Sequence, residues 1–211
     1  MATKPKAKAK TKRKPKADPR DALIDAAYRL AAEQGWHGLG MGDIADAAKI
    51  SPGECSALFS DKTAILAASF ARADRRMDER LAGQGTLDPD ASSARERLFD
   101  VIMTRLEIMQ PQRLAMARIV SDLQCDPAAM LQLWPQIQRS LNGILHAAGL
   151  DTSGLRGMAR RTGLGLLLSR VRPVWLRDDS PDMGPTMAAL DRGLLRIESL
   201  LNYLRPLAAR V

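Results

Sequence analysis

Apolar residues recur along this chain at intervals of three and four positions, and no segment alternates apolar and polar residues as a half-buried strand does. This pattern predicts an all-α protein of about nine helices. Cap-forming residues, glycines and prolines set the expected helix ends. The predicted helices span residues 18–34, 42–48, a short stretch from 51, and then about 61–81, 93–110, 112–124, 127–148, 153–176 and 185–204.

These helices divide into two groups. We predict a Lys-rich disordered tail over residues 1–17, a three-helix head over 18–65, and a helical body over 66–211, with 82–93 as a linker. The helix ending near Leu81 has an apolar stripe suited to leave the head and enter the body. The last helix presents an apolar face that needs a partner, which favours pairing of two protomers. That face contains Met187, Leu190, Leu194, Ile197, Leu201 and Leu204.

Residues 40–59, GMGDIADAAKISPGECSALF, have the form of a helix-turn-helix. Two short helices flank a turn at 48–50, and Ala45 is the small residue that lets them approach. At the start of the second helix, Ser51 can accept from an early backbone N–H while Glu54 reaches back to the N–H of Ser51. Pro52 fits the first helical position. This capping role for Glu54 is favoured over contact with a DNA base.

The net charge of +8 is unevenly distributed. Residues 1–20 contain nine Lys or Arg and one Asp, which leaves 23 basic and 23 acidic residues in the rest of the chain. The high pI therefore describes a tail. The tail is either a solubilising leader or an arm that follows phosphates or makes peripheral contact with an anionic membrane surface.

Several chemistries lack a signature in this sequence. Cys55 and Cys125 stand far apart, and His37 and His146 are the only histidines, so no metal site or disulfide framework is indicated. No Gly-rich loop opens a helix, and no nucleophile has an evident base. The longest apolar run is too short to span a bilayer. We expect a cytoplasmic protein that is not an enzyme and has no cofactor.

Residues 20–82 resemble the amino-terminal domain of TetR-family transcriptional regulators, on the segments ALIDAAYRLAAEQGW, DIADAAKIS and Phe59 with SDK and AIL. The resemblance implies a DNA-binding head and a body that dimerises and often binds a small apolar ligand or lipid. Two positions depart from the family pattern: Lys49 replaces a turn glycine, and Glu54-Cys55-Ser56 replaces a Thr-Leu-Tyr run whose tyrosine contacts phosphate in many members. The candidate residues facing a double-stranded DNA operator are Arg20, Lys49, Ser51, Ser56, Ala57 and Lys62.

A second resemblance points to another function. Residues 95–109 and 172–194 are similar to the accessory lipid-binding proteins of ubiquinone biosynthesis, which implies binding of an isoprenoid lipid with a head that does not read DNA. The most specific part is 175–182, WLRDDSPD, for which a structural explanation is also available: Asp179-Ser180-Pro181 can end one helix and prepare the next. Either family implies an apolar pocket, and the candidate lining residues are Met103, Leu106, Met109, Met116, Trp134 and Trp175.

Overall fold

The computed structural model describes residues 18–84 and 93–208, with side chains described as far as 199. In these ranges the chain forms only helices, which confirms the predicted all-α class. The elements are α1 (Pro19–Gln34), α2 (Met41–Ala48), α3 (Pro52–Leu58), α4 (Lys62–Gln84), α5 (Ala94–Met109), the 3-10 helix η1 (Gln110–Gln112), α6 (Arg113–Leu123), α7 (Pro127–Ala147), α8 (Gly154–Trp175) and α9 (Gly184–Ala208). The predicted tail and most of the predicted linker lie outside the described residues.

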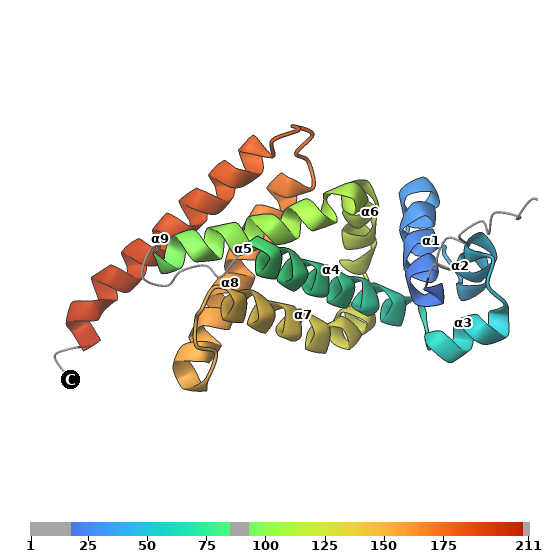
Figure 1. The fold of residues 1–211 in the computed structure, drawn as a ribbon, viewed down its shortest axis with the longest axis horizontal. Coiled ribbons are helices and arrows are strands. Elements are labelled where there is room, and N and C mark those ends of the chain that lie inside the picture. Colours follow the sequence, from blue (N-terminus) through green and yellow to red (C-terminus); the bar gives the residue numbers. More distant parts are fainter. Residues whose placement is uncertain (1–17, 85–92, 209–211) are drawn as a thin grey trace, which may run out of the picture.

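Helices α1, α2 and α3 form a small unit at one end of the molecule, at the right in Figure 1. Asp18 caps α1 by accepting from the N–H of Arg20, and Pro19 occupies the first turn, as the sequence predicts. Gly35 ends the helix with a φ of 88°, a left-handed value that glycine adopts without strain. The unit packs around fully buried Leu23, Ile44 and Ala45. We call α1–α3 the head.

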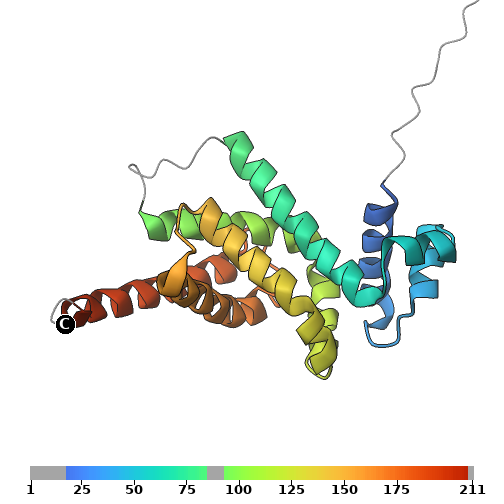
Figure 2. The same cartoon turned by 90° about the horizontal axis from the view of Figure 1, so that it is seen from below.

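Helix α4 runs from the head into the rest of the molecule, which we call the body. Its first turn is capped by Asp61, which accepts from the N–H of Ala64 at 2.8 Å. Figure 2 shows α4 lying beside α7, with α5, α8 and α9 completing the bundle. Buried Met77 of α4 belongs to the same core as Ile102 of α5 and Ile144 of α7. No described helix is long and apolar enough to cross a membrane.

The apolar face of α9 is used partly within the protomer. Leu190 and Leu194 are buried, and Met187 and Ile197 pack against the core, because α9 lies on α5 and α8. Leu201 and Leu204, the rest of the predicted stripe, lie where side chains are not described. The expectation that this face awaits a second protomer therefore fails for its first four residues.

The turn between α8 and α9 is organised by Asp178, whereas the sequence pointed to Asp179-Ser180-Pro181. One carboxylate oxygen of Asp178 accepts from the backbone and hydroxyl of Ser180, and the other accepts from the backbone and hydroxyl of Thr186. Burial would raise the pKa of Asp178, but these hydrogen bonds lower it to about 2. Asp179 instead pairs with Arg113. The WLRDDSPD motif thus has a structural role in joining two helices.

Candidate nucleic-acid interface

The turn between α2 and α3 has a left-handed backbone at Lys49, with φ 57° and ψ 42°. The N–H groups of Lys49 and Ile50 donate to the carbonyls of Asp46 and Ala45 and close the end of α2. A glycine would adopt this conformation without cost, whereas a side chain costs roughly 1–2 kcal/mol. Lys49 therefore places a positive charge at this turn at the cost of backbone strain.

Helix α3 begins as predicted, but its cap is only half of the expected one. Ser51 accepts from the N–H of Glu54 at 3.3 Å, and Pro52 occupies the first turn. The return bond from Glu54 to Ser51 is not formed, and the Glu54 carboxylate has no hydrogen bond or ion pair to any described residue. The reciprocal arrangement does occur at α5, where Ser93 and Glu96 bond each other's backbone. The predicted capping box at Glu54 is wrong.

One side of α3 is anchored and the other is exposed. Cys55 is buried at 2% exposure against the head core, and burial raises the pKa of its thiol, so it has a packing role. Ser56 lies on the exposed side, and its hydroxyl donates back to the carbonyls of Pro52 and Gly53. We call the exposed surface the α3 face; it consists of Lys49, Ser51, Glu54, Ser56 and Ala57.

Arg20, a predicted DNA-facing residue, reaches from the start of α1 to the end of α3. Its guanidinium donates to the carbonyl of Leu58 at 3.1 Å and lies 5.0 Å from the centre of the Phe59 ring. The side chain remains exposed, and most of its donors stay available. Arg20 therefore fixes the end of α3 and adds positive charge beside the α3 face.

Lys62, another predicted DNA-facing residue, is held within the head. Its ammonium group donates to the carbonyls of Trp36, His37 and Leu39 at 2.8, 2.9 and 3.1 Å. An ammonium has three donors, so all of them are engaged by the loop between α1 and α2. A phosphate could be contacted only if these bonds were exchanged.

The head is acidic when the tail is set aside. From Asp18 to Lys62 the chain has eight Asp or Glu and four Lys or Arg. Three of the four cations bond backbone carbonyls: Arg20, Lys62, and Arg29, which donates to Ala47 at 3.1 Å. Lys49 alone among these four has no partner in the described structure. Residues 1–17 contain eight basic and no acidic side chains and therefore hold most of the basic residues in the first 62 positions.

The body holds the head through contacts that the sequence did not reveal. The Asp122 carboxylate, on α6, accepts from the N–H groups of Trp36 and His37, both at 2.8 Å. The loop is thus bonded by α6 through its N–H groups and by Lys62 through its carbonyls. Because Asp122 lies more than 80 positions from this loop, no local sequence pattern could have revealed the contact.

A second set of contacts ties α1 to α4. Buried Arg72 pairs with Asp21 at 3.2 Å and with Asp25 at 2.7 Å. The Tyr28 hydroxyl is bonded to Ser69 at 2.8 Å, and burial raises its pKa. We call these contacts, together with those of Asp122, the head–body junction. The head–body junction thus connects α4 and α6 with α1 and the α1–α2 loop.

The predicted ligand-lining residues lie mostly in the packed core. Met103, Leu106, Met109 and Met116 are buried, and the buried Trp175 indole donates to Gln110 at 2.7 Å. Trp134 was expected to line the pocket, but its side chain is 55% exposed on the surface. Leu133 faces the core, and because each residue turns an α-helix by 100°, the side chain of the following residue, Trp134, points outward. In the described residues no group of side chains could hold a metal ion.

Comparisons with known proteins agree with this architecture. Residues 23–69 match the family described as bacterial regulatory proteins, tetR family. A TetR transcriptional regulator from Nitrosomonas europaea has 27% identity and a TM-score of 0.68, covering 85% of this chain and 98% of its own. A TetR transcriptional regulator from Rhodococcus sp. RHA1 shares the fold, with 18% identity and a TM-score of 0.60 over 83% of this chain and 93% of its own. The fatty acid degradation regulator FadR from Bacillus halodurans also shares it, with 23% identity and a TM-score of 0.60 over 86% of this chain and 97% of its own. No curated protein sequence matches the chain.

A three-helix head with its third helix, α3, exposed, joined by a long helix to a helical body, is the architecture of a helix-turn-helix DNA-binding protein. Together with the family match over residues 23–69, this architecture indicates a DNA-binding transcriptional regulator whose head is similar to that of tetR-family proteins. The comparisons give no support to the ubiquinone-biosynthesis alternative.

Proposed function

We propose that this regulator is a cytoplasmic homodimeric repressor that binds a palindromic operator through the α3 face and responds to a small apolar ligand. The proposal rests on the exposed α3 face, in which the Lys49 ammonium has no hydrogen bond or ion pair to any described residue. Lys49 would contact a phosphate, while Ser51, Ser56 and Ala57 would lie nearest the DNA. Arg20 would add charge, and Lys62 would support the loop behind this surface.

Dimerisation is supported by exposed apolar side chains on the two helices expected to pair. Leu155, Met158 and Leu166 of α8 are 82%, 52% and 55% exposed, and Leu195 of α9 is 39% exposed. Their spacing along α8 brings them to one side of the helix. Two such helices from each protomer would form a four-helix contact. Light scattering should give twice the 23.0 kDa chain mass at micromolar concentration.

The DNA proposal is tested by selecting random duplex DNA with the full-length protein. Enrichment of a palindrome whose half-sites are one helical turn apart, about 34 Å, is the expected result. Retention of DNA without any enriched sequence would contradict an operator-reading head. A monomer in light scattering would contradict the dimer separately, because DNA capture and subunit pairing are measured independently.

A further inference from the structure

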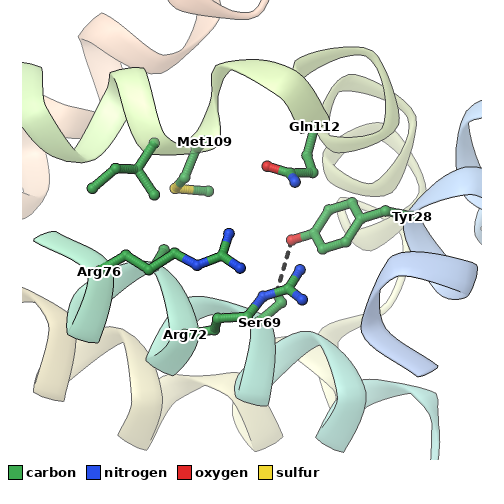
Figure 3. Close-up of a pocket in the computed structure, with 8 residues that line it drawn as sticks. Tyr28, Ser69, Arg72, Arg76, Met109 and Gln112 are labelled. Carbon is green, nitrogen blue, oxygen red and sulfur yellow. Dashed lines mark hydrogen bonds between the residues drawn. The ribbon is translucent and has the colours of Figure 1, made fainter. Parts of the chain in front are cut away.

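A small pocket opens at the place where head and body meet. Figure 3 shows the polar ends of Tyr28, Arg72, Arg76 and Gln112 converging on it from α1, α4 and η1. Its volume of about 20 Å³ holds roughly one water or a group as small as a carboxylate. Its other lining residues are Ser69, Ala73, Ile108 and Met109.

The two arginines of this pocket are in different electrostatic states. They are four residues apart on α4, so their side chains share one side of the helix. Arg72 is buried and already paired with Asp21 and Asp25. Arg76 is exposed and has neither a hydrogen bond nor an ion pair to any residue described in the structure. An anion in this pocket would give the Arg76 guanidinium a partner.

We propose that this pocket binds the carboxylate of an organic acid carrying an apolar chain, with Arg76 as the principal partner. A guanidinium presents parallel N–H donors that match the two oxygens of a carboxylate. The amide of Gln112 supplies a further donor, and Ala73, Ile108 and Met109 form an apolar wall for the first carbons of the chain. The remainder of the chain would leave through the open side of the pocket.

The position of the pocket gives such a ligand a route to the head. Tyr28 belongs to α1, Arg76 to α4, and Gln112 to the 3-10 helix that leads directly into α6. Helix α6 carries Asp122, which bonds the α1–α2 loop. A bound carboxylate would therefore favour one arrangement of α1, α4 and α6 over others. This inference rests on the proposed ligand-responsive function and names the ligand class.

The test uses octanoate as the probe and neutral octanamide as its uncharged match, each titrated calorimetrically into the full-length protein. Octanoate is expected to bind and octanamide to bind much more weakly. Arg76→Gln should weaken octanoate binding roughly tenfold to a hundredfold, because a charge-assisted pair is removed. The matched control is Arg75→Gln, which removes the same charge one residue away at an exposed position outside the pocket. This control should bind octanoate as the unmodified protein does.

Three results would overturn the carboxylate site: no octanoate binding, equal binding of octanamide, or equal losses in the two variants. Affinity for the selected operator without octanoate separates this inference from the proposed function. Arg76→Gln should retain that affinity, since Arg76 lies on α4 away from the α3 face. Loss of the carboxylate site with intact operator binding would refute the site alone. Octanoate binding by a protein that selects no DNA would refute the operator proposal alone.

Discussion

The side of the head that faces the body and the α3 face use charged groups differently. Toward the body, Arg72 is paired with two carboxylates and Asp122 accepts two backbone N–H groups. On the α3 face, Lys49 and Glu54 are exposed and have no partner among the described residues. Charges that hold the head in place are therefore distinct from those available to DNA. This difference separates substitutions that affect stability from those that affect DNA binding.

The largest expected effect is on DNA affinity when the tail charge is removed. Deleting residues 2–17 removes eight positive charges and leaves a head with twice as many acidic as basic residues. Because phosphate neutralisation provides most non-specific affinity, binding should weaken by at least about a hundredfold at moderate salt. Filter-binding assays at several salt concentrations measure this loss of DNA affinity. Replacing the eight Lys and Arg by Gln should have the same effect, which separates charge from chain length.

Lys62→Met should reduce stability. The substitution keeps much of the side-chain length but leaves three loop carbonyls without their donor, at a cost of roughly 1–3 kcal/mol in the free energy of unfolding. Urea denaturation followed by circular dichroism measures the change. The opposite result would be an unchanged free energy of unfolding together with a decrease of about one in the slope of log DNA affinity against log salt concentration. That result would make Lys62 a phosphate contact, as the sequence predicted.

Asp178→Asn should also destabilise the protein, by roughly 1–3 kcal/mol at pH 7, because an amide nitrogen would meet N–H and O–H donors. The pH dependence identifies the cause. The folded pKa of about 2 lies below the ordinary 3.8, so this carboxylate stabilises the fold above pH 4 and the contribution is lost as pH falls through 2. The difference between the two proteins should shrink over that range. If the difference in the free energy of unfolding stayed constant over this pH range, the destabilisation would be due to packing and not to the carboxylate charge.

The smallest effect is expected at the α2–α3 turn. Lys49→Gly removes a charge and relieves the left-handed strain, so stability should stay the same or rise by up to about 1 kcal/mol. Operator affinity should fall several-fold, and the slope of its salt dependence should decrease by about one. Lys49→Ala is the matched control, since it removes the charge but keeps a side chain in the strained conformation. An unchanged affinity in both would exclude Lys49 from the interface.

Local signals explain which parts of this fold could be predicted from sequence. The start of α1 and the cap at Ser51 follow from neighbouring residues, and the structure confirms both. The wrong expectations concern side chains that had more than one possible partner. Glu54 was expected to return to Ser51 and does not, and Asp178 rather than Asp179 organises the last turn.

The contacts between head and body could not be predicted in the same way. Lys62 and Asp122 meet the α1–α2 loop only after the chain has folded, and their partners are backbone groups without a sequence signature. The pocket beside Arg76 also joins three elements far apart in sequence. By contrast, the helix-turn-helix was recognisable because its two helices and turn occupy twenty consecutive residues.

The central claim is that the α3 face reads DNA sequence while the tail supplies attraction. The most direct measurement is the affinity ratio between the selected operator and a scrambled duplex, for the full-length protein and for the protein lacking residues 2–17, at the same salt concentration. The account predicts that both affinities fall on truncation while their ratio is maintained. A ratio that falls to one without the tail would contradict a sequence-reading α3 face.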